Sequence, residues 1–145
     1  MALSSCIFCN ISSGQDSGTV LETETDEFVI FKDIRPASQH HYLAVTKQHF
    51  PSLKDLDNSH QDLISRLEEG LREFLKGQGV CSEDVLFGFH LPPFISVRHL
   101  HMHAIAPRSE MGFLSRLVFR PSSVWFKTAD EARLYLAQKK SLQSN

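Results

Sequence analysis

Hydrophobic and polar positions along the chain alternate in several short segments and follow a helical period in one long segment. Five short runs are rich in aliphatic, β-branched or aromatic residues, which is typical of strands. The predicted strands span residues 19–24, 27–34, 41–47, 84–90 and 99–106. Between residues 59 and 77, apolar side chains recur every three or four positions, so this segment is predicted to form one amphipathic helix.

Local signals mark the ends of these elements and add two short helices. One helix is predicted within residues 6–14, where Gly14 can end it, and a second after Thr128, because Thr128 and Glu131 match a capping box. Ser59 is expected to cap the long helix. The chain is therefore predicted to be an α+β domain with a mostly antiparallel sheet of about five strands, one long helix and short terminal helices.

Composition narrows the class of protein without changing this picture. The 145 residues suit one domain, and the net charge of -2 has no basic excess, so nucleic acid is not an expected partner. No apolar run approaches the roughly 20 residues that span a bilayer, and residues 1–10 lack a secretory signal, so no membrane contact is expected. Three cysteines, an odd number, argue against a disulfide framework. We expect a cytoplasmic location, with the nucleus as a second compartment.

Three histidines, His99, His101 and His103, alternate with apolar residues from the start of the last predicted strand. Side chains on a strand alternate between its faces, so the three imidazoles are expected to line one face and their apolar neighbours the other. Adjacent imidazoles disfavour each other's protonation, so the row can hold a neutral nucleophile beside hydrogen-bonded partners. The plain alternatives are a metal-binding histidine tract and a solvated strand face.

The stretch "HLHMHAI" resembles the His-x-His-x-His-x-x signature of the histidine triad family. The blocks "CIFCNISSG", "FVIFKDIRPASQHHYLAVTKQH" and "GFHLPPFISVRHLHMHAIAP" also resemble blocks of that family, in the same order. Together they cover most of residues 6–107. The resemblance implies a single domain of histidine triad fold over residues 1–145, in which residues 108–145 form a subfamily-specific C-terminal segment.

The resemblance also implies a reaction, the hydrolysis or transfer of nucleoside monophosphates through a nucleotidyl-histidine intermediate. Adenosine 5'-monophosphoramidase activity, which releases AMP from AMP-linked amines, is the leading hypothesis. The family pattern makes His101 the nucleophile and assigns His103 to phosphate oxygen or the leaving group. It assigns His41 to orienting His101 or to shaping its protonation, and it directs the Ser96 hydroxyl and N–H toward the phosphate. A turn serine is the plain alternative for Ser96.

A nucleoside pocket follows from the same resemblance. Asp33 matches an acid that binds the ribose hydroxyls, although a turn aspartate would look the same. The positions that match apolar residues flanking the base, and that could equally be plain core, are Ile7, Phe8, Ile11, Phe31, Ile34 and Leu43. The expected ligand is an AMP-type purine nucleotide. Phe94–Ile95 replaces a Gly-Gln pair of many members, which argues against dinucleoside polyphosphates, and Gly88 replaces an asparagine that contacts the nucleotide in some relatives.

Cys6 and Cys9 form a C-x-x-C pair, which fits either a redox pair or half of a metal site, and no βαβ context supports the redox reading. Some histidine triad proteins resemble this chain in having two cysteines, a histidine after the third strand and the first triad histidine. That resemblance implies a structural zinc site formed by Cys6, Cys9, His49 and His99. The alternative keeps His99 as a metal-free member of the triad. No organic cofactor is expected.

The family usually pairs two sheets across a twofold axis, so a homodimer is expected, with the long helix and a central strand at its interface. Trp125 and Phe126 are candidates for such contacts, or for a local core. Two other functions remain open from the sequence. One is hydrolysis of adenylated DNA ends, as in the aprataxin branch, against which the slightly acidic net charge counts. The other is a nucleotide-binding scaffold with little turnover.

Overall fold

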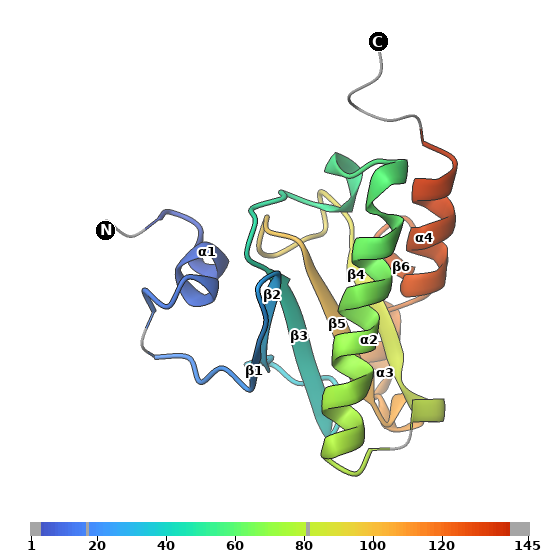
Figure 1. Cartoon of the computed structure of the whole chain (residues 1–145). Helices are drawn as coiled ribbons and strands as arrows, with labels where there is room; N and C mark the ends of the chain where they lie inside the picture. Colours follow the sequence, from blue (N-terminus) through green and yellow to red (C-terminus); the bar gives the residue numbers. More distant parts are fainter. Residues whose placement is uncertain (1–3, 17, 81, 140–145) are drawn as a thin grey trace.

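The computed structural model describes residues 4–16, 18–80 and 82–139. Six strands form one antiparallel sheet in the order β1-β2-β3-β5-β4-β6 (Figure 1). The strands are β1 (Thr23–Glu24), β2 (Phe28–Lys32), β3 (His40–Thr46), β4 (Leu86–His90), β5 (His101–Ala106) and β6 (Phe126–Thr128). The α-helices are α1 (Ile7–Ser12), α2 (Gln61–Gly77), α3 (Phe113–Val118) and α4 (Ala129–Ala137). Short 3-10 turns lie at Leu53–Asp55, Asn58–His60, Ser82–Asp84 and Arg108–Glu110. The predicted α+β class is confirmed.

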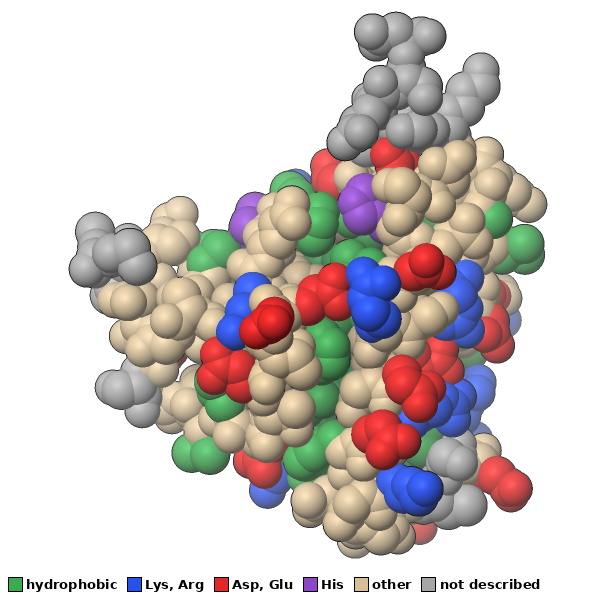
Figure 2. All heavy atoms as spheres, viewed as in Figure 1, with side chains coloured by type: hydrophobic (Ala, Val, Ile, Leu, Met, Phe, Trp, Pro, Cys, Tyr) green, Lys and Arg blue, Asp and Glu red, His purple; other side chains and the backbone are tan. Residues whose placement is uncertain are grey.

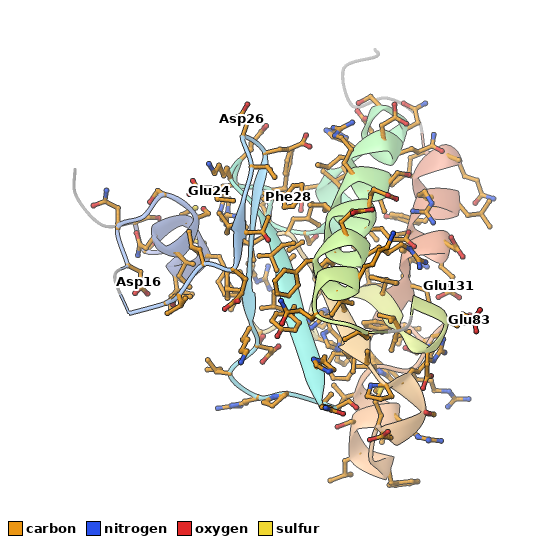
Figure 3. All side chains as sticks on the ribbon, turned by 60° about the horizontal axis from the view of Figure 1, so that its bottom comes forward. Asp16, Glu24, Asp26, Phe28, Glu83 and Glu131 are labelled. Atoms are coloured by element: carbon orange, nitrogen blue, oxygen red, sulfur yellow. The ribbon has the colours of Figure 1, made fainter. Side chains whose placement is uncertain are left out.

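Helices α2 and α4 cover one face of the sheet and form the main core with it (Figure 1). The predicted apolar stripe of α2 is buried there, at Leu63, Ile64, Leu67, Leu71 and Leu75. Phe28 points from β2 toward α2 (Figure 3). A Cβ at Gly70 would lie 2.5 Å from the Phe28 ring, so the lack of a side chain at Gly70 allows α2 to approach β2 closely. On the outside, Glu68 joins the two helices by pairing with Arg72 and Arg133.

The solvent face over α2 carries acidic and basic side chains in mixed order (Figure 2). Mixed charges of this kind form a solvated face and produce no strong field of one sign. Among the described residues, no helix is both long enough and apolar enough to cross a membrane.

The opposite face of the sheet carries three groups of residues in a row. Helix α1 packs with β2 and β3 in a small apolar cluster, which includes Phe8, Ile11, Phe31 and Leu43. Strand β5 lies next to β3 and places the histidines in the middle of the face. Residues of the C-terminal segment pack over β4 and β5, where Phe119 and Phe126 form the third apolar cluster. The histidines are therefore flanked by α1 on one side and by the C-terminal segment on the other.

Several local predictions need correction. The sheet has six strands because β6, only three residues long, pairs with β4, and so short a segment shows no alternation in the sequence. Strand β1 covers only two of the residues predicted at 19–24. Strand β5 begins at His101, so the prediction that His99 lies on this strand is wrong. Here the His99 N–H is donated to the Val97 carbonyl, which takes the backbone out of the ladder.

The helix ends show one wrong and two confirmed predictions. The predicted cap at Ser59 is wrong, because the Asp57 side chain caps the 3-10 turn that leads into α2. The capping box of Thr128 and Glu131 at the start of α4 is confirmed. Gly14 follows α1 with a φ of 83°, the left-handed conformation that glycine adopts without strain.

Candidate active site

Four histidines from three neighbouring strands lie together on the sheet face opposite α2. His41 comes from β3, His101 and His103 from β5, and His90 from the end of β4. The rings of His101 and His103 are 5.0 Å apart, and the His103 ring lies 5.1 Å from those of His41 and His90. His41, His101 and His103 are buried. The pairing of strands distant in the sequence thus creates a cluster larger than the H-x-H-x-H motif.

The hydrogen bond of His101 determines which of its nitrogens is free. Its Nδ1 lies 2.7 Å from the His99 carbonyl oxygen, which can only accept, so the proton of a neutral ring is assigned to Nδ1. Nε2 then carries the lone pair. Burial lowers the pKa of His101 to about 4, so the ring is neutral at physiological pH. The structure therefore presents the predicted nucleophile in its reactive form, with the Phe8 ring 5.0 Å away.

The protons on His41 and His103 follow by the same reasoning. The Ala37 N–H donates to His41 Nδ1 at 2.9 Å, so the proton of His41 lies on Nε2. His41 Nε2 in turn lies 2.9 Å from His103 Nδ1, which must accept. The proton of His103 is therefore on its Nε2, which is buried and has no hydrogen-bond partner among the described residues. The Ala37 amide thus fixes the proton positions of both rings and leaves His103 Nε2–H as a free donor. These two hydrogen-bonded histidines are here called the His41–His103 pair.

Burial is also the main reason why these rings stay neutral. It lowers the pKa of His41 to about 4, although Asp33 opposes the shift, and it lowers the pKa of His103 well below its ordinary value. The structure places His41 against His103, not against His101. Of the two predicted roles of His41, this contact agrees with an influence on the protonation of the triad, exerted through His103.

A cavity of about 380 Å³ opens beside these histidines. It collects ten of the predicted site residues, namely Ile7, Phe8, Ile11, Phe31, Asp33, Ile34, Leu43, Ser96, His101 and His103. Ile34 lies at its rim, 92% exposed, whereas Phe8, Ile11, Phe31 and Leu43 are buried in its wall. Ser96 lies on the exposed loop before β5. The structure thus brings the predicted nucleoside-binding residues and three of the four predicted catalytic residues to one cavity, whereas His41 lies behind His103 and does not line it.

Asp33 combines the two predicted possibilities, a turn aspartate and a cavity residue that could bind ribose. Its Oδ1 accepts the Arg35 N–H at 2.7 Å, an Asx turn as the plain alternative expected. Its Oδ2 lies 3.4 Å from His41 Nε2 and 3.8 Å from His103 Nδ1, while the side chain also borders the cavity. The carboxylate is therefore in reach of both a cavity ligand and the His41–His103 pair.

A second polar cluster, here called the Cys–His cluster, lies at the N-terminal end of β5. It consists of Cys6, Cys9, His49 and His99, whose ligand atoms all lie within 4.8 Å of one another. The separations are 3.3 Å from Cys6 Sγ to His99 Nδ1, 3.2 Å from Cys9 Sγ to His49 Nδ1 and 3.1 Å between the two Nδ1 atoms. His99 Nε2 lies 2.6 Å from the Thr46 carbonyl, so its proton is there and Nδ1 faces the cysteines as a lone pair. Burial lowers the pKa of His99 and raises that of Cys9, so His99 stays neutral but the Cys9 thiolate is disfavoured without a cation.

Comparisons with known proteins agree with this geometry. Residues 5–118 match the family model described as "Scavenger mRNA decapping enzyme C-term binding". Adenosine 5'-monophosphoramidase HINT3 of Xenopus tropicalis is 49% identical over 128 residues, which are 88% of this chain and 84% of the relative. The protein is a histidine triad protein.

Two further relatives place this histidine triad protein more closely. The mouse (Mus musculus) adenosine 5'-monophosphoramidase HINT3 is 44% identical over 94% of this chain and 81% of its own length. A histidine triad protein from Clostridium difficile superposes with a TM-score of 0.66 at 27% identity, covering 72% of this chain and 92% of that one. The predicted fold is therefore confirmed, and this histidine triad protein is most like the HINT3 relatives.

Sequence reasoning missed two residues that contact His103 in this histidine triad protein, His90 and Phe119. The ring of Phe119 lies 5.1 Å from the His103 ring and 4.8 Å from the His90 ring, and Phe126 lies 5.1 Å from His90. A Cβ at Gly88 would lie 2.4 Å from the Phe126 ring, so Phe126 fills the space beside Gly88, where some relatives have asparagine. Phe126 is fully buried, which decides its predicted role in favour of a local core. Strand alternation from Gly88 could have placed His90 on the histidine face, but Phe119 gives no local signal.

Proposed function

We propose that this protein is an adenosine 5'-monophosphoramidase, which hydrolyses AMP-linked amines. One observation carries the proposal: His101 and His103 border one cavity with opposite protonation of Nε2. The Nε2 of His101 offers a lone pair, whereas that of His103 offers a proton. A nucleophile next to a proton donor is what the displacement of an amine from phosphorus requires. The names of the HINT3 relatives support the same activity.

The cavity orients the substrate for this reaction. The base lies between the apolar walls from α1 and β2–β3, which are formed by Ile7, Phe8, Ile11, Phe31 and Leu43, with Ile34 at the rim. The Asp33 carboxylate accepts hydrogen bonds from the ribose hydroxyls. The α-phosphate then lies over β5, within reach of His101, His103 and Ser96. Because base contact is mainly apolar, discrimination between purines is weak.

The reaction proceeds in two displacements. His101 Nε2 attacks the α-phosphorus, its N–P bond forms while the P–N bond to the amine breaks, and the departing nitrogen takes the proton of His103 Nε2 in the same step. His103, neutral before the step, is left as an imidazolate that accepts from His41 Nε2–H, and its negative charge lies next to the positive charge gained by His101. Water then attacks phosphorus, returns a proton to His103 and expels His101, so AMP and the free amine are the products. The Ser96 hydroxyl and N–H bind the phosphate oxygens on which charge develops.

An AMP-amine conjugate tests this proposal. The native protein is expected to release AMP and, after rapid acid quenching, to carry one AMP linked to His101, which peptide mass spectrometry detects. His101→Asn removes both signals, while His40→Asn, a change at the neighbour of His41 on β3, keeps them. AMP release without any adenylated protein would reject the covalent route, and tight AMP binding without turnover would favour the scaffold function.

We further propose that the Cys–His cluster holds a structural zinc ion. Tetrahedral zinc with bond lengths of about 2.0–2.3 Å requires ligand atoms roughly 3.3–3.8 Å apart, close to the separations in the cluster. Three features support the fit: two thiols, two Nδ1 atoms that face each other, and the Thr46 carbonyl that orients His99. Bound zinc supplies positive charge and a cross-link between α1, the segment after β3 and the start of the triad. Metal analysis of native protein is expected to give one zinc per chain.

The expected homodimer stays a prediction, and the structure adds one constraint to it. The outer edge of β4 pairs with β6, and α4 packs against α2, so part of the surface expected at the interface is already covered within the chain. Sedimentation equilibrium of the full chain measures the oligomeric state directly. A mass of one chain would reject the dimer.

A further inference from the structure

Two thiols, those of Cys6 and Cys9, take no part in the proposed reaction and are open to other chemistry. Both side chains are half-buried, so a small molecule can reach the sulfurs from solvent. Cys6 is the N-cap of α1 and Cys9 lies in its first turn, where the Cys9 N–H is donated to Cys6 Sγ at 3.4 Å. The two thiols therefore lie on the same side of the first turn of α1.

The two sulfurs are close enough to be joined to each other. Cys6 Sγ and Cys9 Sγ both contact His99 Nδ1, at 3.3 Å and 3.5 Å, and they lie within 4.8 Å of one another. Residues three positions apart across a helical turn have Cα atoms about 5–6 Å apart, which a disulfide can span. Side-chain rotation can thus bring the sulfurs into a bond while the backbone keeps its path.

A disulfide and a zinc ion are alternative states of the Cys–His cluster. Two thiolates on tetrahedral zinc lie about 3.7 Å apart, whereas the sulfurs of a disulfide are about 2.0 Å apart and carry no charge with which to bind a cation. His49 and His99 would remain as two ligands, fewer than the four of a closed structural site. Formation of the disulfide therefore releases the ion.

Helix α1 depends on the Cys–His cluster for its position beside the nucleotide cavity. It lies at the outer side of the sheet, away from α2 and α4 (Figure 1), and its six residues are too few to form a stable helix alone. Without the metal link, Phe8 and Ile11 anchor it through the small apolar cluster. The same two residues line the cavity, and the Phe8 ring lies 5.0 Å from the His101 ring. Loss of the link therefore loosens the wall on which the base packs.

We propose that Cys6 and Cys9 are a site of reversible oxidation by hydroperoxides, and that their disulfide releases zinc and weakens nucleotide binding. The proposal rests on the zinc site and the nucleotide cavity proposed above, and it places both under one control. A disulfide of this kind forms and breaks in the folded protein, and a dithiol reductant reverses it.

The oxidation proceeds in two steps. One sulfur attacks the peroxide, whose O–O bond breaks as a sulfenic acid forms and the first water leaves. The second sulfur then attacks the sulfenic sulfur, so that the S–S bond forms and the hydroxyl leaves as the second water. Two electrons pass from the sulfurs to the O–O bond. Two thiols supply the protons of the waters, and solvent supplies them when the sulfurs start as zinc thiolates.

The test treats zinc-loaded native protein with an equimolar amount of hydrogen peroxide. After alkylation of the remaining thiols, mass spectrometry is expected to find Cys6 and Cys9 in one unalkylated peptide, lighter than its dithiol form by two hydrogen atoms. A zinc-binding dye should record one ion released for each disulfide. Calorimetry should show AMP affinity lower by roughly tenfold, the scale on which a few apolar contacts act. Dithiothreitol and zinc together should restore it.

Two variants separate the disulfide from the metal and from the third cysteine. His49→Asn removes an exposed ligand and keeps both thiols, so it should form the same disulfide without a release of zinc. Cys81→Ser leaves Cys6 and Cys9 as the only cysteines of the chain and should behave as native protein does in all three measurements.

Several outcomes overturn the proposal. Cys6 and Cys9 that are still alkylated after peroxide treatment, in native protein and in His49→Asn, reject the oxidation site. Zinc that stays bound to the disulfide form rejects its release, whereas reduced native protein without zinc rejects the zinc site itself. Equal AMP affinity of the two redox forms rejects the control of the cavity, whereas reduced protein that binds no AMP rejects the nucleotide function.

Discussion

The two histidine clusters on the same sheet face differ in how their hydrogen-bond donors and acceptors follow one another. In the His41–His103 pair they alternate, from the Ala37 N–H to His41 Nδ1 and from His41 Nε2–H to His103 Nδ1. In the Cys–His cluster the Thr46 carbonyl takes the proton of His99, so a lone pair faces two sulfurs and another imidazole nitrogen.

The difference shows why histidines of one motif can have separate chemistry. An alternating chain is satisfied without any ion, and it delivers a proton to the end that faces the cavity. In the Cys–His cluster the imidazole lone pairs face thiols, which can donate S–H to them or, as thiolates, bind a cation together with them. His101 lies between the two, and the hydrogen bond of its side chain to the His99 carbonyl leaves its other ring nitrogen with a lone pair.

The largest expected effects come from replacing His101 and His99 separately and comparing the two variants. His101→Asn should lower kcat by roughly 10⁴-fold or more, because no other group can form the covalent bond. Zinc content and unfolding temperature should stay near native. His99→Asn should do the reverse, with metal lost and the adenylated intermediate still detectable. A His99→Asn protein that keeps its zinc would contradict the division of roles.

Removal of a sulfur ligand should cost stability and nucleotide affinity together. Cys9→Ser is expected to lower the free energy of unfolding by about 3 kcal/mol, since metal binding contributes folding energy. AMP affinity should also fall, because Cys6 caps α1 and Cys9 lies within it, and the same helix carries Phe8 and Ile11 of the base wall. Calorimetry with AMP and thermal unfolding measure both effects. Cys81→Ser, at the cysteine outside the described residues, is the control and should change neither.

The His41–His103 pair predicts a graded effect at His41. His41→Ala leaves His103 Nδ1 without its donor, so kcat should fall by roughly 30-fold with little change in KM. His41→Gln keeps an N–H that can reach His103 and should recover most of this loss. If alanine and glutamine were equally harmful, hydrogen bonding to His103 would not be the function of His41. His40→Ala is the matched neutral control.

The smallest effect concerns stability against pH. The pKa of His41 is lowered to about 4 in the folded protein from an ordinary 6.5, so below pH 6.5 the unfolded chain binds a proton that the folded chain does not. The contribution of neutral His41 to the free energy of unfolding is therefore fully present above pH 6.5. It is lost as the pH falls toward 4, and about 1 kcal/mol of it is lost at pH 5.5. Urea unfolding from pH 7.5 to 5.5 should show a shallower decrease for His41→Gln. An identical slope would place the titration elsewhere.

Much of this site could be predicted because its signals are local. The H-x-H-x-H spacing marked His101 and His103, and the order of the family blocks brought Asp33 and Ser96 into the same proposal. His90 and Phe119 could not be predicted in this way, since they reach His103 only through the pairing of β4 with β5 and the return of the C-terminal segment over that sheet.

The sequence by itself determined the long helix, most of the strands and the set of candidate site residues, because hydrophobic periodicity and motif spacing act over a few neighbouring positions. Only the tertiary structure decided which hydrogen bonds each histidine side chain makes. The proton of an imidazole goes to the nitrogen that faces an acceptor, and these partners, the Thr46 carbonyl for His99 and the Ala37 N–H and His103 for His41, come from folding of the backbone and pairing of strands.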